Sequence, residues 1–275
     1  MRKTLSLLLF FAAAGCVAQS RVIIQGRITN TDGTAVEYAT IGIPGKGSGT
    51  LSSADGTFIL DTEACGSDTL VVSHVSYEEI KVTVNELLDM AGNVVMKARE
   101  LREAVVYSGK RKKAVLAGKG MKIPGAATMF TIANKGCEIG SMVEAERVFE
   151  LHEISFKVRS NSITGARFSV NIYKENEQTG EFNNTLCKPI YLDIPVNAGK
   201  QEITVEVKER VAIEPSRYFV SLMFVDYKNA DKTAHTGRIY FPLYLKSSCT
   251  RKGVMHSLEQ IPVNMGLSLK GVEYR

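Results

Sequence analysis

The feature that most limits how this chain can fold is a repeated alternation of apolar and polar residues in short runs. In residues 22–97 these runs are about five residues long, and turn pairs such as Asp55-Gly56 separate them. A strand with this pattern buries one face only, so its stable form is two sheets packed face to face. The alternation returns from Thr128 onward, cleanly at 166–173, and no long segment has the 3.6-residue period of a helix. The sequence therefore predicts an all-β protein of two antiparallel β-sandwich domains.

Changes in composition divide the chain into four predicted parts. These are a signal peptide at 1–18, a first sandwich at 22–97 that ends with a strand at 80–84, a basic linker with an edge strand at 98–127, and a second, jelly-roll-like sandwich at 128–275. The linker assignment depends on charge, because seven basic residues and no acidic one lie between Ala104 and Gly136. Glycines and alanines lie among these charges, and charge runs of this kind usually stay solvated.

The first sandwich contains the sequence pattern of a known family. The matching segments are Gly26-Arg27-Ile28-Thr29, Asp32-Gly33, Val36-Glu37-Tyr38-Ala39-Thr40-Ile41, residues 45–50, Ala54-Asp55-Gly56-Thr57-Phe58 and Ser73-His74-Val75-Ser76-Tyr77. Together they resemble the carboxypeptidase regulatory-like domain, although Ser76 replaces the usual glycine before Tyr77. The resemblance implies a transthyretin-like, seven-stranded sandwich without an active site. It also implies an exported protein of the Bacteroidetes type, in which this module can precede the plug of TonB-dependent transporters.

The segment after the first sandwich supplies the predicted interaction surface. Residues 101–107 resemble the strand that leads from this module to the plug in the transporters, and basic residues follow. The candidates are Val105 and Tyr107 on an edge strand, with Lys110, Arg111, Lys112 and Lys113 beside it. The edge could add to a partner's sheet, and the charges could contact an anionic glycan, lipid headgroups or solvent alone. A complete transporter is excluded, because a barrel of about 22 strands does not fit in the roughly 150 remaining residues.

The N-terminus predicts export. A positively charged start precedes a short apolar run at 5–14, which is half of the roughly 20 residues that a membrane-spanning helix needs. Small side chains suit cleavage after Ala18. The alternative is a lipoprotein, because residues 13–16 resemble a lipobox in which Cys16 carries the lipid. The expected location is the periplasm or the outer membrane, with membrane attachment only through Cys16.

Composition favours a folded chain and excludes nucleic acid as a partner. Apolar residues make up 44% of the sequence, which is enough to build cores. The net charge of +5 falls to about +3 when the signal peptide is removed, and that field is too weak to attract nucleic acid. Four cysteines then remain, which allow no disulfide, one or two, in three possible full pairings. They are Cys65, Cys137, Cys187 and Cys249.

No catalytic, metal-binding or cofactor-binding residue is predicted. His256 and Glu259 have the H-x-x-E spacing of zinc carboxypeptidases, but residues three apart in a strand face opposite sides. The G-x-S-x-G, H-E-x-x-H and Walker motifs do not occur. The chain is therefore expected not to be an enzyme.

The leading functional hypothesis is a non-catalytic binding or scaffolding protein of the cell envelope. The second sandwich would recognise a glycan or an outer-membrane protein through its loops, and the first would act as a spacer or docking unit. Five tyrosines either form a sugar platform or are ordinary sheet residues: Tyr173, Tyr191, Tyr227, Tyr240 and Tyr244. The alternatives are a purely structural component of an outer-membrane transport or adhesion system, and an envelope hydrolase without a recognisable motif. The sequence leaves the ligand and the oligomeric state open.

Overall fold

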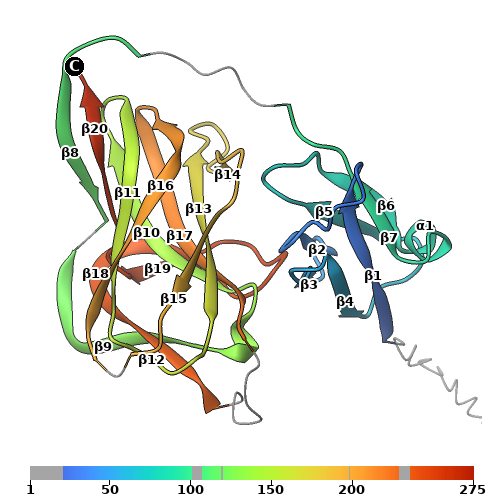
Figure 1. Cartoon of the computed structure of the whole chain (residues 1–275). Helices are drawn as coiled ribbons and strands as arrows, with labels where there is room; N and C mark the ends of the chain where they lie inside the picture. Colours follow the sequence, from blue (N-terminus) through green and yellow to red (C-terminus); the bar gives the residue numbers. More distant parts are fainter. Residues whose placement is uncertain (1–20, 101–106, 119, 198, 229–235) are drawn as a thin grey trace, which may run out of the picture.

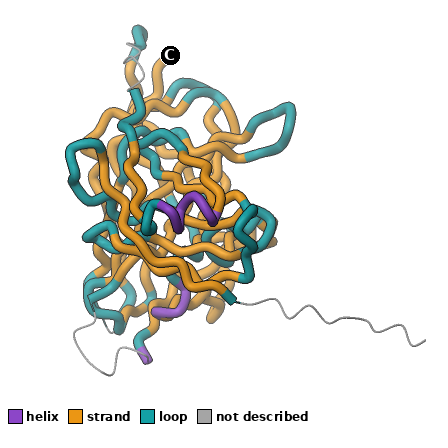
Figure 2. Tube along the Cα trace, turned by 90° about the vertical axis from the view of Figure 1, so that its right-hand side faces the viewer, coloured by secondary structure: helices purple, strands orange, loops and turns teal. Residues whose placement is uncertain are grey.

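Two β-sandwich modules lie side by side in a computed structural model of the chain (Figure 1). The structure describes residues 21–100, 107–118, 120–197, 199–228 and 236–275. Within these ranges strands dominate and helix is confined to short segments, as Figure 2 shows. The predicted all-β fold of β-sandwich domains is confirmed.

The first module contains seven strands in two sheets. The strands are β1 (Val22–Asn30), β2 (Thr40–Ile43), β3 (Ser48–Leu51), β4 (Thr57–Thr62), β5 (Thr69–Ser73), β6 (Ile80–Thr83) and β7 (Asn93–Met96). One sheet has the order β4-β1-β7 and the other β3-β2-β5-β6, and the core between them includes Ile24, Leu60 and Leu70. The pair β1–β7 is parallel, which differs from the antiparallel sandwich that we expect from the sequence. A parallel partner requires a long crossover, and the chain supplies it through β5, β6 and a short helix.

The helix α1 (Val84–Asp89) replaces the end of the strand expected at 80–84. Thr83 is its N-cap and accepts a hydrogen bond from the Glu86 backbone N–H at 3.2 Å. The Glu86 carboxylate in turn accepts from the Thr83 backbone N–H at 2.7 Å. This reciprocal capping box satisfies donors that a helix start leaves unpaired, so the T-x-x-E spacing ends the strand after Thr83.

The second module is also built from two sheets. The larger has the order β12-β18-β10-β17-β13-β14, with β15 on β13 and both β19 and β9 on β18, and the smaller is β16-β11-β20-β8. Their bounds are β8 (Arg111–Ala117), β9 (Met121–Thr131), β10 (Glu138–Ala145), β11 (Phe149–Val158), β12 (Ser160–Asn161), β13 (Ala166–Glu175), β14 (Phe182–Asn184), β15 (Ile190–Ile194), β16 (Gln201–Ile213), β17 (Ser216–Asp226), β18 (Arg238–Arg251), β19 (Glu259–Asn264) and β20 (Ser268–Tyr274), with a 3-10 turn at Ile132–Asn134. The chain passes repeatedly between the two sheets, from β8 to β9, β10 to β11, β11 to β12, β15 to β16, β16 to β17 and β19 to β20, as in a jelly-roll-like sandwich.

Much of the predicted linker at 98–127 belongs to the second module. β8 pairs antiparallel with β20 along its whole length, and β9 pairs with β18. In β8 the side chains of Ala114 and Leu116 pack against the core, while Lys113 and Val115 point outward and are exposed. The strand was missed because its start carries three consecutive basic residues, and the alternation becomes visible only beyond them.

The large sheet of the second module is covered on both faces. Val170 and Ile172 of β13 point into the core of the sandwich. Asn171, between them, points to the outer face and is nevertheless only 5% exposed. The first module covers part of this outer face, where its Tyr38 and Leu51 form a cluster with Met223 and Val225 of β17, among others. The covered outer face therefore forms the contact between the two modules.

The predicted signal peptide, with Cys16, lies outside the described residues. In the part of the chain that the structure covers, none of the helices is long and apolar enough to cross a bilayer.

Candidate functional site

Tyr38 fixes the two modules to each other. Its backbone has a φ of 54°, a conformation that is uncommon for a residue with a side chain, and its ring is buried. The ring meets that of Tyr191 edge-on, with centroids 5.2 Å apart. Its hydroxyl donates to Asp226 Oδ2 at 3.0 Å, and burial together with this carboxylate raises the pKa of Tyr38 to about 12. Lys135 Nζ lies 3.3 Å from the other oxygen of Asp226, so a cation balances the charge of this half-buried carboxylate.

A loop at 252–258 of the second module packs against the β2–β3 hairpin of the first. An added Cβ at Gly49 would lie 2.7 Å from the Val254 carbonyl oxygen, and one at Gly42 would lie 2.5 Å from Met255 Cγ. These approaches are too close for any larger residue. Gly42 and Gly49 therefore allow the close contact between the modules.

A cleft of about 540 Å³ lies beside this contact, a size typical of small-molecule sites. The first module contributes Tyr38, Thr40, Ser73, His74, Val75, Glu79 and Arg99, and the second contributes Ser169, Asn171, Tyr173, Asn183, Asn184, Leu186, Pro189, Tyr191, Met223, Val225 and Arg251. Most of these side chains carry hydroxyl, amide or guanidinium groups. Neither module builds the cleft alone.

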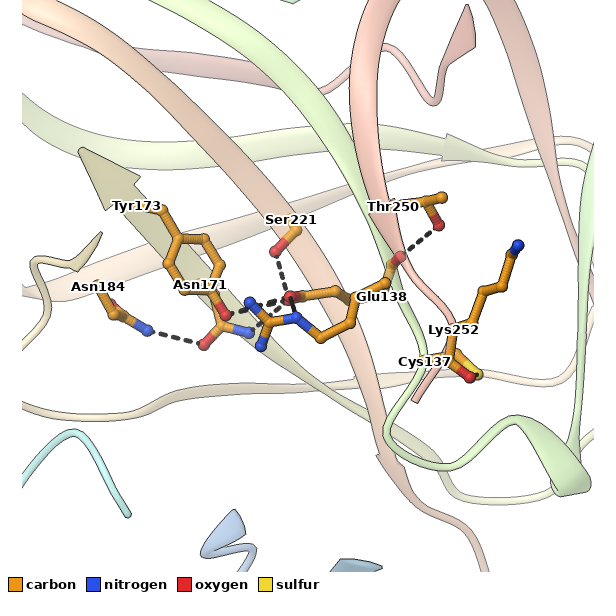
Figure 3. Close-up of polar contacts among 9 residues, drawn as sticks. Cys137, Glu138, Asn171, Tyr173, Asn184, Ser221, Thr250 and Lys252 are labelled. Carbon is orange, nitrogen blue, oxygen red and sulfur yellow. Dashed lines mark hydrogen bonds and ion pairs between the residues drawn. The ribbon is translucent and has the colours of Figure 1, made fainter. Parts of the chain in front are cut away.

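A buried carboxylate organises the wall that the second module provides (Figure 3). Glu138, at the start of β10, is 0% exposed. Its carboxylate accepts hydrogen bonds from Ser221 Oγ at 2.8 Å, Asn171 Nδ2 at 3.1 Å and the Tyr173 hydroxyl at 3.2 Å. Asn184 Nδ2 then donates to Asn171 Oδ1 at 3.1 Å, which extends the network from β10 across β17 and β13 to β14. A buried network with its carboxylate oxygens satisfied holds these groups rigidly.

Arg251 supplies the positive charge that balances Glu138. The two residues are directly opposite each other in the β10–β18 register, and Nε lies 3.2 Å from Oε1 without the alignment of a hydrogen bond. The guanidinium lies 5.5 Å from the centre of the Tyr173 ring. Burial opposes the charge of Arg251, but the Glu138 carboxylate and the Tyr173 hydroxyl together outweigh it and raise the pKa of the guanidinium. Burial, reinforced by the Glu138 charge, also raises the pKa of Tyr173.

His74 is the histidine that lines this cleft. Its Nδ1 accepts from the Ser76 backbone N–H at 3.2 Å, which leaves the proton of the neutral ring on Nε2. Nε2 lies 3.5 Å from the Tyr191 hydroxyl, which donates to the Glu37 carbonyl at 3.4 Å. Burial, and to a smaller degree the charge of Arg99, lower the pKa of His74 to about 4, so the ring is neutral at pH 7.

The predicted interaction surface lies away from the cleft. Lys110, Arg111, Lys112 and Lys113 are exposed at and just before the start of β8, on the edge of the small sheet. Tyr107 is half-buried, and its ring centroid is 5.7 Å from that of Tyr274. Val105 and Cys16 fall outside the described residues. Binding at this surface stays a prediction.

The structure does not bring His256 and Glu259 together on an ion. Both are exposed; His256 lies against Gly47 and Gly253, while Glu259 pairs with Lys252 Nζ at 2.8 Å. Among the described residues no group of three or more His, Cys, Asp or Glu is arranged to hold a metal. The four cysteines at 65, 137, 187 and 249 are free thiols.

Of the five tyrosines considered as a platform, only Tyr173 and Tyr191 line the cleft. Tyr227 instead stacks on Phe224, and Tyr244 is buried. Glu138, Ser221 and Arg251 are site residues that were not predicted from the sequence. The sequence does contain one indication of this site. Residues 218–225 form an almost unbroken apolar run, which is typical of a strand buried on both faces, and the polar Ser221 interrupts that run.

Fold and cleft together define a protein of two joined β-sandwiches with a polar site at their junction. Residues 24–106 match the family described as the CarboxypepD_reg-like domain, which confirms the resemblance found in the sequence. A search of curated proteins finds no match to the chain.

Solved structures show only distant similarity. A family two carbohydrate esterase from Cellvibrio japonicus is 12% identical with a TM-score of 0.23, and the match covers 60% of this chain and 36% of that one. The structure of infectious bursal disease virus Gx strain is 14% identical with a TM-score of 0.26, and the match covers 92% of this chain and 55% of that one. A carbohydrate-binding module of the β-sandwich superfamily is 11% identical with a TM-score of 0.19, and the match covers 88% of this chain and 97% of that one. The chain thus spans about a third to just over half of the first two. All three TM-scores are too low to transfer any property to this chain.

Proposed function

We propose that the chain is a non-catalytic, exported binding protein of the cell envelope that recognises a glycan, with the regulatory-like module docked rigidly on the recognition module. The observation that carries this proposal is the cleft at the junction, because hydroxyl, amide and tyrosine side chains line it over a fixed polar wall. Such walls suit ligands that present many hydroxyl groups beside an apolar ring face.

The state of His74 supports a binding role rather than catalysis. A general base needs an accessible nitrogen and a pKa near the working pH. Both nitrogens of His74 already face partners in the protein, and its pKa is far below 7. The cleft polar groups thus hold one another in place.

A glycan array tests this function. The exported chain is expected to bind a subset of glycans and to release them intact by mass spectrometry. Asn183→Ala, which removes an exposed amide at the cleft, should weaken the binding, whereas Gln178→Ala, an exposed amide outside it, should not. Failure to bind any glycan would contradict the proposal. Hydrolysis of a bound glycan that disappears in His74→Gln would favour an envelope hydrolase.

A second candidate is a structural component of an outer-membrane transport or adhesion system. The observation that favours it is β8, which forms one edge of the small sheet and carries Arg111, Lys112 and Lys113 on exposed positions. An acidic, extended segment of a partner protein could add to this edge as a further strand. Crosslinking in cells, followed by isolation of the chain with an outer-membrane protein, tests this candidate. Replacing the three basic residues by serine should abolish the crosslink if β8 is the contact.

Export and lipidation form the remaining part of the proposal. Mass spectrometry of the mature N-terminus should show cleavage after Ala18, or a lipid on Cys16. A mass that includes residues 1–18 would contradict export through this signal.

A further inference from the structure

The charges on the cleft walls are not balanced. Two cationic side chains, Arg99 and Arg251, line the cleft, and its acidic side chain is Glu79. Glu79 is neutralised by Lys81, with Nζ and Oε1 3.2 Å apart. Arg99 is exposed and has no ion-pair partner among the described residues. The cleft therefore has a surplus of positive charge, contributed by the first module.

Arg251 is held in a fixed position. Glu138 faces its Nε and Tyr173 lies under its guanidinium, so the group cannot rotate freely. Among the described residues the guanidinium pairs with no carboxylate other than Glu138, and the Tyr173 hydroxyl is its other polar neighbour. The side chain is 21% exposed and lines the cleft. A planar guanidinium with free donors is the group that binds a carboxylate in a two-point contact.

The other groups around these two arginines suit a sugar. Thr40 and Ser73 of the first module share a hydrogen bond of 2.7 Å between their hydroxyls at the edge of the cleft. Asn183 and Asn184 lie on the opposite wall, and the ring of Tyr191 provides an apolar surface. Hydroxyl and amide groups pair with sugar hydroxyls, while an aromatic ring covers a sugar face.

We infer that the cleft between the two modules binds an acidic saccharide, with the sugar carboxylate between Arg251 of the second module and Arg99 of the first. This inference rests on the proposed glycan-binding function and makes it specific in two ways. It requires a carboxylate on the sugar, and it requires both modules for binding.

Calorimetry with the exported chain and trigalacturonate tests the inference, with the neutral trisaccharide of galactose as the reference ligand. The acidic trisaccharide is expected to bind at least tenfold more tightly, and to lose affinity as salt is added. Arg99→Met should weaken this binding about tenfold or more, since it removes a charged hydrogen-bond donor from an exposed position. Arg251→Lys keeps the charge opposite Glu138 but loses the two-point contact, and should weaken binding while the fold remains.

Lys97→Met is the matched control, because Lys97 is an exposed cation of the same module, paired with Glu78 outside the cleft. It should leave the affinity unchanged. Equal binding of the acidic and neutral trisaccharides would overturn the inference and leave glycan binding intact. Unchanged affinity in both arginine variants would place the site elsewhere and also overturn it. Binding of an acidic peptide in place of every saccharide would overturn both the inference and the proposed function.

Discussion

Glu138 and Arg251 face each other across the β10–β18 pair, with Nε 3.2 Å from Oε1 and the carboxylate fully buried. A buried ion pair contributes little net stability compared with apolar residues, but it is costly to break on one side only. This pair therefore fixes the geometry of the cleft wall more than it stabilises the sheet.

Glu138→Gln should reduce the free energy of unfolding by about 3 kcal/mol, because it leaves the largely buried charge of Arg251 without its carboxylate partner. Denaturant titration followed by circular dichroism measures the loss. Adding Arg251→Met in the same chain should restore most of it. Glu175→Gln, which breaks an exposed pair with Arg217, should cost less than 1 kcal/mol and serves as the control. A loss in Glu138→Gln as small as in the control would contradict the network.

Tyr38→Phe should destabilise the contact between the modules by about 1 kcal/mol, since Asp226 loses a hydrogen bond. The expected result is an earlier unfolding transition in urea with unchanged secondary structure. The matched variant is Tyr227→Phe, because it also removes a tyrosine hydroxyl, while the Tyr227 ring stacks on Phe224 of the same module. Identical midpoints for the two variants would show that the Tyr38 hydroxyl does not join the modules.

Gly49→Ala should loosen the docking of the two modules, because the new methyl group would collide with the backbone and side chain of Val254. Overpacking of this kind costs about 1–3 kcal/mol. Small-angle scattering should report a larger radius of gyration, while each sandwich keeps its strand signal. Gly199→Ala places a methyl group in open space and should scatter as the unmodified chain does. An unchanged radius for Gly49→Ala would mean that the loop at 252–258 yields easily.

His74 should make the protein less stable in mild acid. The pKa of His74 is about 4 in the folded state, and its ordinary value of 6.5 applies to the unfolded chain. Between pH 4 and pH 6.5 the unfolded chain therefore binds one proton more than the folded chain. The stabilisation is complete above pH 6.5 and is lost as the pH falls toward 4, by about 1.4 kcal/mol per pH unit. Unfolding titrations over this range, repeated on His74→Gln, should show that the variant lacks this part of the slope. A slope that persists in His74→Gln and disappears in His152→Gln, an exposed histidine, would contradict the assignment.

Part of the fold could be read directly from residue patterns. The alternation in β4 and β13 and the glycine turn at Asp55-Gly56 depend on neighbouring residues only, and they suffice to predict stacked strands. The parallel pairing of β7 with β1 could not be predicted this way, since it joins residues such as Arg27 and Asn93 that lie far apart in the sequence. The start of α1 was readable from Thr83 and Glu86, but the apolar Val84 favours a strand equally well.

What the sequence by itself determined is which side chains each strand presents to each face, because that follows from a period of two residues along a single segment. Only the tertiary structure decided what covers those faces. Asn171 and Ser221 are outward-facing by the alternation, and they are buried because polar groups of other strands, Glu138 among them, lie against them on that face. The cleft with Glu138, Arg251 and Arg99 arises in the same way, since contacts between segments far apart carry no local periodicity.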